Sequence, residues 1–370
     1  MIRVNNIQAN LNVDLAGLKE IVSIKTGLDP EYIKSVKIAK KSVDARNKGN
    51  VHFVYSLDME VWGDEDYIAT ILAWKDIELI KERPVLVIRK QQPGNIRPLV
   101  VGSGPAGMFA GLALAEAGLK PVIIERGKPV DERQKDVSLF WRTGKLKPDS
   151  NVQFGEKDKY SAKVLQELAA AGAPEEILYL AKPHIGTDKL VTVVQNIRKK
   201  IIALGGEYRF GECLCGLAVE ENRLRAVQIR RADGTVYEQP TEKLILAVGH
   251  SARDTFEMLY EAGVVMERKP FSIGARIEHL QTMIDAAQYG RYAGRAELGA
   301  ADYKLAVHLA NGRSAYTFCM CPGGVIVPAM TDPSESVVNG MSSSGRNSRW
   351  ANSGIVTEVR LTDFEHLRGE

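Results

Sequence analysis

The clearest pattern of apolar and polar positions lies between residues 99 and 125. Leu99–Val101 form a short apolar run, residues 108–118 carry apolar side chains at helical spacing, and residues 121–125 form a second apolar run that ends in an acid. Short apolar runs bounded by turn residues are typical of buried parallel strands, and spacing of three to four residues is typical of a helix. The pattern therefore predicts a strand, turn, helix and strand of an α/β fold.

The turn of this unit is built from closely spaced glycines. Gly102 permits a tight turn, Gly104 lets backbone N–H groups approach a pyrophosphate on the helix N-terminus, and Gly107 allows the helix to pack close to the strand. Glu125 ends the second strand, where a carboxylate accepts hydrogen bonds from both hydroxyls of an adenosine ribose and disfavours a 2′-phosphate. We therefore predict a site for a dinucleotide, FAD or NAD, in the loop Gly102, Ser103, Gly104, Pro105, Ala106 and Gly107.

Residues 1–92 predict a separate small α+β domain. Its expected strands are 2–11, 35–43, 51–61 and 84–89, and its expected helices are 15–26 and 65–74. A cluster of chain breakers at residues 91–95 marks its end. Basic residues gather on the central hairpin, at 34–48; a solvated strand edge protected by lysines is the favoured interpretation, and a basic patch for an acidic partner is the alternative.

The dinucleotide-binding domain is expected to span residues 96–262. Its last expected strand, residues 243–248, is apolar on both faces and ends at Gly249, as a buried parallel strand that carries backbone to a ligand does. We predict that it joins the sheet of residues 99–101 through right-handed crossovers. A mixed β-rich domain is expected at residues 263–348, and residues 349–370 are expected to begin the return to the first sheet.

Composition narrows the function classes. The chain has 370 residues, 45% hydrophobic and 26% charged, as in globular proteins with several domains. A formal net charge of +3 gives no argument for nucleic acid or a membrane as partner. Without a long apolar stretch or a signal-peptide pattern, we expect a soluble cytoplasmic protein.

The cysteines occur as two pairs, Cys213 with Cys215 and Cys319 with Cys321. A spacer of one residue is shorter than that of structural zinc sites, so reduced thiols on strands are favoured over zinc or a redox disulfide. The histidines form no HExxH or similar cluster, and we expect no metal. The turn Pro322-Gly323-Gly324 is expected to bring backbone close to a ligand.

Several longer motifs carry a family resemblance. They are the segments 150–156, 182–188, 249–254, 277–279 and 319–324. With them the chain resembles the FAD-dependent dehydrogenases of bacteria, flavoproteins with a glutathione-reductase-like FAD domain, over about residues 52–364. The resemblance implies that the cofactor is FAD and that the fold is α/β, with a Rossmann-like FAD-binding domain, an inserted mixed β-rich domain and the N-terminal α+β domain.

The resemblance also implies further cofactor contacts. Glu125 and Arg126 are similar to the ribose-binding end of an FAD domain, and Leu214 falls in the segment that meets the adenine. The remaining implied contacts are Arg133, Ala247, Val248 and Gly249. Leu214 and Val248 are equally compatible with the core. His250, one residue past the last strand, is our candidate to donate a hydrogen bond or move a proton near the flavin, with a structural histidine as the alternative.

This sequence departs from the family pattern at two places. After Glu156 it lacks a glycine-rich loop, and family members continue well beyond the position of Phe364. We therefore expect that the working protein is longer than these 370 residues.

The function predicted from these observations is a FAD-dependent oxidoreductase, a dehydrogenase or reductase, that acts on an unidentified small molecule with NAD(P)H as a possible electron donor. Two alternatives stay open. One is a nucleotide- or RNA-associated protein with a structural FAD, and the other is an NAD-dependent dehydrogenase.

Overall fold

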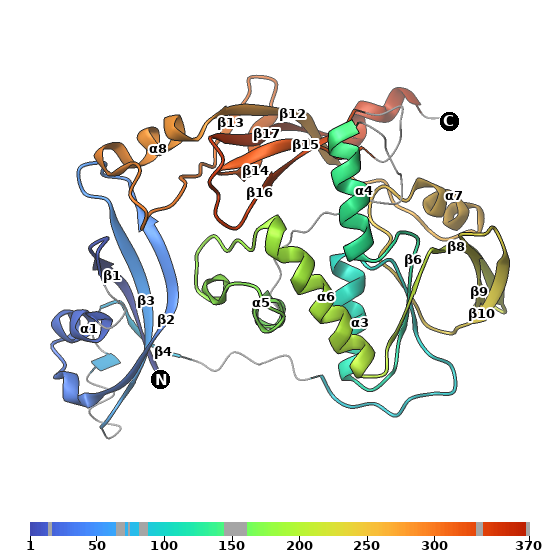
Figure 1. The fold of residues 1–370 in the computed structure, drawn as a ribbon, viewed down its shortest axis with the longest axis horizontal. Helices are drawn as coiled ribbons and strands as arrows, with labels where there is room; N and C mark the ends of the chain where they lie inside the picture. The colour runs from blue at the N-terminus through green and yellow to red at the C-terminus, as the bar shows by residue number, and fades with distance from the viewer. Residues whose placement is uncertain are drawn as a thin grey trace.

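The computed structural model describes residues 1–13, 17–63, 71–72, 75–80, 88–143, 161–330 and 336–367. They form an N-terminal α+β domain, a central domain around a parallel sheet, and a β-rich domain (Figure 1). The motif at 150–156, the loop position after Glu156 and most of the expected elements 65–74 and 84–89 lie outside the described residues.

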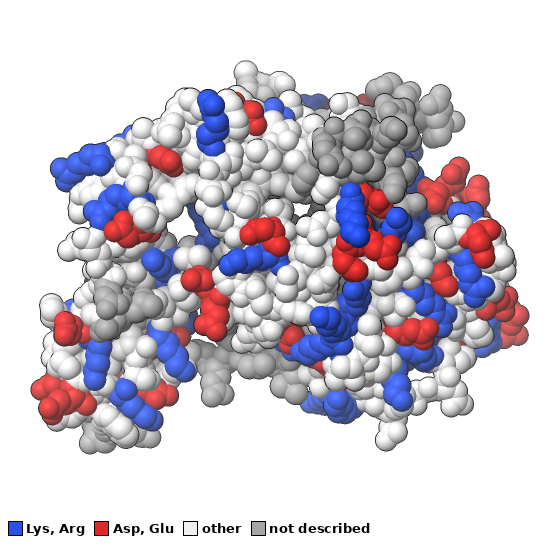
Figure 2. Space-filling view, viewed as in Figure 1, with Lys and Arg blue, Asp and Glu red and all other residues white. Residues whose placement is uncertain are grey.

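Charges of both signs are interspersed over the face shown in Figure 2, where Lys and Arg lie beside Asp and Glu. This fits the small formal net charge of +3. In the part of the chain that the structure describes, no helix is long and apolar enough to span a bilayer.

The N-terminal sheet has the strand order β2-β3-β1-β4. Its elements are β1 (Ile2–Ala9), α1 (Leu18–Thr26), η2 (Pro30–Tyr32), β2 (Ile33–Asp44), β3 (His52–Val61) and β4 (Ile77–Leu79). Alternate residues of β3 are buried, as expected for a sheet with one solvated face. The short strand β4 was not predicted, because three residues are too few to show an alternating pattern.

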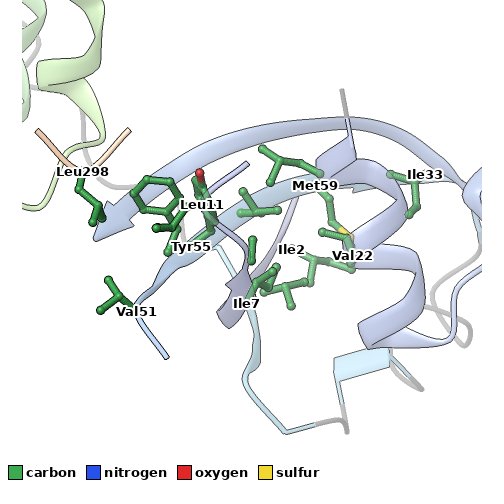
Figure 3. Packing of buried hydrophobic residues seen from close by; sticks show 14 of the residues in the cluster. Ile2, Ile7, Leu11, Val22, Ile33, Val51, Tyr55, Met59 and Leu298 are labelled. Atoms are coloured by element: carbon green, nitrogen blue, oxygen red, sulfur yellow. The ribbon is translucent and has the colours of Figure 1, made fainter. Parts of the chain in front are cut away.

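The core of the N-terminal domain is shared with the β-rich domain. Ile284, Tyr289, Leu298 and Ala301 belong to the same cluster of buried residues as the N-terminal strands. Figure 3 shows Leu298 beside Tyr55 at the end of the N-terminal sheet. These residues lie in or after α8 (Gln281–Tyr289) and η4 (Gly290–Tyr292). Burial of apolar surface therefore fastens the two domains together.

The central sheet is parallel and has the order β11-β5-β6-β7. Its strands are β5 (Leu99–Val101), β6 (Val122–Glu125), β7 (Glu207–Phe210) and β11 (Leu244–Leu246). The predicted pairing is confirmed: residues 244–246 run parallel to residues 99–101 in register. The chain thus returns after more than a hundred residues to the strand that precedes the glycine turn.

The two faces of the parallel sheet are covered differently. One face packs Val100 and Ile123 against helices α3 and α6, and the other packs Val101 and Ile124 against the antiparallel sheet β10-β9-β8. The helices of this domain are α3 (Pro105–Glu116), α4 (Val130–Thr143), α5 (Ser161–Ala170), η3 (Glu175–Leu178), α6 (Thr187–Ala203) and α7 (Arg253–Glu261). The antiparallel strands are β8 (Glu212–Glu220), β9 (Arg223–Arg231) and β10 (Val236–Pro240).

The β-rich domain consists of the sheet β12-β17-β14-β13 and the hairpin β15-β16. Its elements are β12 (Phe271–Leu280), β13 (Ala306–His308), β14 (Ser314–Cys321), β15 (Gly324–Pro328), β16 (Val338–Ser342), β17 (Trp350–Val359) and η5 (Leu361–Leu367). Strand β17 lies between β12 and β14, so residues 350–359 pair with the β-rich domain, although residues 349–370 were expected to begin the return to the dinucleotide-binding domain. This strand was not predicted because Asn352 and Ser353 are polar although they are buried, so the sequence lacks an apolar run at this position.

A network of charged side chains joins the helices beside the parallel sheet. Lys163 and Lys200 each contact both Glu116 and Glu167, at distances between 2.5 and 3.2 Å. Burial opposes ionisation of Glu167, but its hydrogen bonds with the two lysines outweigh burial and lower the pKa of this carboxyl group. The network therefore ties α5 to α3 and α6.

We expect Glu167→Gln to lower the free energy of unfolding by about 1 to 2 kcal/mol at pH 7, because it removes charge-assisted bonds at a buried position. Since the folded pKa of Glu167 lies below the ordinary value of 4.5, this contribution is present at neutral pH and is lost as the pH falls through the lowered pKa. Thermal unfolding at pH 7 and pH 4 measures the difference. Glu257→Gln, at an exposed position of α7, is the control. Equal effects of the two variants at pH 7 would contradict the role of the network.

Candidate functional site

A cleft of about 640 Å³ opens at the carboxyl ends of the parallel strands. Val101, Glu125 and Leu246, which end β5, β6 and β11, line its floor. From β5 the chain continues to β6 on one side, and β11 lies on the other side. The cleft is therefore at the point where the strand order reverses, which is where open α/β sheets bind ligands.

Nearly all site residues predicted from the sequence line this cleft. They are Gly102, Gly104, Pro105, Ala106, Glu125, Arg126, Arg133, Leu214, Ala247, Val248, Gly249 and His250. The two others lie directly behind it. Ser103 donates to Glu125, and Gly107 packs against Gly102. The fold thus brings together residues that are up to 148 positions apart, from 102 to 250.

The three glycines of the loop are explained by different physical constraints. Gly102 has φ +96°, and a Cβ there would lie 2.3 Å from the carbonyl oxygen of Ala247. A Cβ on Gly107 would lie 1.8 Å from the carbonyl oxygen of Gly102. A Cβ on Gly104 would meet nothing within 4 Å, although this residue lines the cleft. The protein itself requires Gly102 and Gly107, whereas Gly104 leaves open space toward a ligand.

That open space lies at the N-terminus of α3. Gly104 is the N-cap residue and Pro105 is the first helical residue, and among the described residues no side chain caps the helix. The first N–H groups of a helix lack intrahelical partners and carry the positive end of the helix dipole. These backbone groups fit a phosphate, and the absent side chain at Gly104 gives it room.

Glu125 is the buried anion of the site, with 8% of its surface exposed. Its Oε2 accepts hydrogen bonds from the backbone N and Oγ of Ser103, at 2.8 and 2.9 Å, and its Oε1 accepts from the N of Gly127 at 2.8 Å. An Nη2 atom of Arg133 lies 3.6 Å from Oε1. Since a carboxylate has about four acceptor positions, Glu125 fixes the glycine loop and keeps capacity for a ligand hydroxyl.

Arg126 connects the end of β6 to α7. Its Nη2 donates to both carboxylate oxygens of Asp254, at 3.0 and 3.1 Å, and to Oγ1 of Thr255 at 3.0 Å. Burial disfavours the Asp254 carboxylate, but the hydrogen bonds and charge of Arg126 outweigh it and lower the pKa of Asp254. Arg126 therefore holds α7 over the cleft, a role that the sequence did not suggest.

Leu214 and His250 occupy opposite environments in the cleft. Leu214 is 3% exposed and belongs to the core between the parallel and antiparallel sheets, as does the partly buried Val248. His250 is exposed, and its Nε2 lies 3.2 Å from Oγ of Ser251. Leu214 and Val248 thus serve both core and cleft, and the His250 side chain stays accessible from solvent.

Sequence reasoning missed other lining residues. They include Glu212, Cys213, Thr255, Phe256 and Leu259. The first two follow from the position of β8 beside the strand ends, and the rest belong to α7. The amphipathic pattern of α7 predicts a helix, but no local motif shows that its apolar face covers a ligand site.

The basic hairpin of residues 34–48 is partly neutralised within the protein. Lys34 pairs with Glu60 at 3.3 Å, and Arg46 pairs with Asp44. Lys41 lies 4.0 Å from the ring centroid of Phe53, and its backbone bonds to residues 179 and 181 of the central domain. Burial lowers the pKa of Lys41. Part of the expected solvated edge is therefore an intramolecular contact.

Comparisons with known proteins agree with the geometry of the cleft. Residues 97–176 match the model of an FAD binding domain, residues 270–369 match that of an FAD-dependent protein, C-terminal domain-like, and residues 1–60 match a domain of unknown function. An uncharacterised protein of Clostridium beijerinckii is 40% identical over 381 residues, which cover 98% of this chain and 70% of the relative. The chain belongs to a family of FAD-dependent proteins.

Solved structures show more distant similarity. A flavoprotein/dehydrogenase from Cytophaga hutchinsonii is 11% identical with a TM-score of 0.38, over 74% of this chain and 58% of that one. The protein THI4 from Thermovibrio ammonificans is 18% identical with a TM-score of 0.34, over 46% of this chain and 64% of that one. This FAD-dependent chain thus spans less than two thirds of either structure, and similarity at this level says nothing about its substrate.

The glycine geometry gives a matched pair of variants. We expect Gly104→Ala to leave the thermal midpoint of the FAD-free protein unchanged and to weaken FAD binding about ten-fold or more, because its Cβ occupies only ligand space. We expect Gly107→Ala to lower the midpoint strongly, because its Cβ overlaps a carbonyl oxygen. Fluorescence titration with FAD and thermal unfolding give both quantities. Wild-type FAD affinity in Gly104→Ala would show that the phosphate lies elsewhere.

Proposed function

We propose that this protein is a FAD-dependent oxidoreductase of the dehydrogenase or reductase type, with NAD(P)H as electron donor. The observation that carries the proposal is the open N-terminus of α3 at Gly104, which faces a cleft that also contains Glu125. Both Gly104 and Glu125 lie within residues 97–176, the segment matched to an FAD binding domain. When bound, FAD supplies the hydride and electron transfer chemistry, and the protein supplies binding, orientation and electrostatics.

Each end of the cleft suits one part of the cofactor. In our proposal the N–H groups after Gly104 hold the pyrophosphate, and Glu125 accepts a hydrogen bond from the adenosine ribose. Leu214 gives an apolar contact for the adenine, and the backbone at Ala247 to Gly249 covers the ribose and pyrophosphate. The groups that we assign to the pyrophosphate and the ribose are backbone N–H groups and the Glu125 carboxylate, and a carboxylate at the ribose fits a dinucleotide whose ribose carries no phosphate.

His250 is the proposed proton-handling residue. It lines the cleft, is exposed, and Ser251 supplies a hydrogen-bonding partner for its Nε2. An imidazole can act as a general acid or base, so His250 can accept or donate a proton as the substrate is oxidised or reduced. Replacement of His250 by Gln is therefore expected to slow turnover without loss of FAD.

The alternative functions gain no specific support from the described residues. The basic hairpin is partly neutralised by Asp44 and Glu60 and partly packed on the central domain, so our proposal assigns it no nucleic-acid partner. An NAD-dependent dehydrogenase would use the same glycine turn, but the segment around that turn matches an FAD binding domain.

The ribose contact can be separated from the structural role of Glu125. We expect Glu125→Gln to weaken FAD binding by about 1 to 3 kcal/mol, because the ribose loses a charge-assisted hydrogen bond. Ser103→Ala is the matched control, since it removes the Oγ bond to Glu125 but leaves the carboxylate in the cleft. Calorimetric titration with FAD measures both. Equal losses in the two variants would assign Glu125 to loop structure alone.

Anaerobic reduction tests the proposed reaction class. The FAD-loaded protein is titrated with NADH and NADPH while the flavin absorbance is followed. Bleaching by either nucleotide is the expected result. Absence of bleaching by both nucleotides, with FAD still bound, would contradict the proposed reductase.

A further inference from the structure

The end of β14 carries two cysteines, Cys319 and Cys321, in an unusual backbone. The register of β14 against β17 shifts between Phe318 and Cys321, and Cys319 has φ +48°. Left-handed backbone is uncommon for a residue with a side chain, and such positions concentrate at functional sites. In a regular strand, residues i and i+2 point to one face about 6 to 7 Å apart, whereas this bulge turns the Cys321 thiol toward the backbone of Cys319, whose carbonyl oxygen it contacts at 3.4 Å.

The two thiols differ in access. Cys319 is exposed and Cys321 is 8% exposed. The Sγ of Cys321 lies 3.4 Å from the carbonyl oxygen of Cys319. Between them, Met320 packs against the core shared by the N-terminal and β-rich domains. The end of β14 is thus anchored by Met320 and carries one exposed and one buried sulfur.

Arg276 of β12 organises the pair. Its Nη1 lies 3.9 Å from Sγ of Cys321 and donates to Asn352, and its Nη2 donates to the carbonyl oxygen of Cys319 at 2.8 Å. A Cβ on Gly340 would lie 2.0 Å from Nη1 and 2.7 Å from Sγ of Cys321. The absence of a side chain at Gly340 therefore makes room for the guanidinium beside the sulfur.

The surroundings make the two sulfurs chemically distinct. The hydrogen bond from the Cys321 thiol outweighs burial and, with the charge of Arg276, lowers the pKa of Cys319 to about 6. The same hydrogen bond and burial raise the pKa of Cys321, although Arg276 and Arg346 oppose this. At neutral pH, Cys319 is then mainly a thiolate, which is the nucleophilic form, and Cys321 keeps its proton.

The other cysteine pair has the same spacing but a different environment. Cys213 and Cys215 contact the carbonyl oxygens of Leu214 and Gln228, both at 3.5 Å. Burial raises the pKa of Cys213. This pair therefore provides an internal control within the same chain.

We propose that Cys319 and Cys321 form a peroxide-reactive dithiol. The Cys319 thiolate attacks one oxygen of hydrogen peroxide: an S–O bond forms, the O–O bond breaks, and the leaving hydroxide takes a proton to become water. The Cys321 sulfur then attacks the Cys319 sulfenic acid: an S–S bond forms, the S–O bond breaks, and the second hydroxide leaves as water with the thiol proton. Two thiols and one peroxide give one disulfide and two waters.

This site is separate from the proposed FAD function. Neither Cys319 nor Cys321 is among the described residues that line the cleft. At the turn Pro322-Gly323-Gly324, Gly323 packs against protein backbone, since a Cβ there would lie 1.7 Å from the carbonyl oxygen of Arg346.

The test treats the reduced full chain with one equivalent of hydrogen peroxide at pH 7 and maps thiols by differential alkylation and peptide mass. We expect a disulfide within the peptide that contains residues 319–321, formed about ten times faster than any oxidation of Cys213 or Cys215, and reversed by dithiothreitol. Equal oxidation rates of the two pairs, or formation of sulfinic acid without a disulfide, would overturn the proposal.

Single variants separate the two roles. In Cys321→Ser, the Cys319 sulfenic acid is expected to accumulate and to be trapped by dimedone, while Cys319→Ser is expected to lose the fast reaction. Cys213→Ser is the control and is expected to react as the wild type does. In the wild type, the alkylation rate of Cys319 should rise as the pH passes about 6. A sulfenic acid trapped instead on Cys321 would reverse the assignment and overturn the proposed order of attack.

Discussion

The carbonyl oxygen of Ala247 approaches Gly102 so closely that a Cβ on Gly102 would lie 2.3 Å from it, and the carbonyl of Gly102 in turn leaves no room for a side chain on Gly107. This stack of backbone on backbone joins the end of β11 to the glycine turn and to α3. The cleft depends on it, because the strand ends and the helix N-terminus meet only when the three segments touch. Glu125 completes the assembly by accepting hydrogen bonds from the Ser103 side of the same turn.

The glycine turn, Glu125 and the return of residues 244–246 to the sheet could be predicted because each has a local signature. Steric demands select glycine at Gly102 and Gly107, a strand buried on both faces is apolar throughout, and the acid follows at a fixed place in the unit. Helix α7 could not be assigned to the site, since its position depends on the contact between Arg126 and Asp254, which are distant in sequence. The packing of the N-terminal domain on the β-rich domain could not be predicted either, because Leu298 and the residues near it, which complete the N-terminal core, are distant in sequence.

Strand β17 and the cysteines at the end of β14 show why sequence patterns do not predict structure where the interior is polar. Asn352 is fully buried, and its side chain accepts a hydrogen bond from Arg276. A polar residue at this buried position interrupts the alternation of apolar and polar residues that would predict a strand. The contact of the Cys321 thiol with the carbonyl oxygen of Cys319 comes from a bulge and a left-handed residue, which the spacing of the two cysteines does not reveal. The same arginine supports both features. Hydrogen bonds between strands that are distant in sequence therefore determine which parts of the β-rich domain cannot be predicted from the pattern of apolar residues.

The central claim is that the cleft binds the adenosine diphosphate half of FAD through the N-terminus of α3 and Glu125. The most direct measurement is competition against FAD, followed by flavin fluorescence, with ADP and FMN as competitors. We expect ADP to displace FAD, and we expect FMN, which lacks the adenosine and the pyrophosphate, to compete far more weakly. Displacement of FAD by FMN but not by ADP would contradict it.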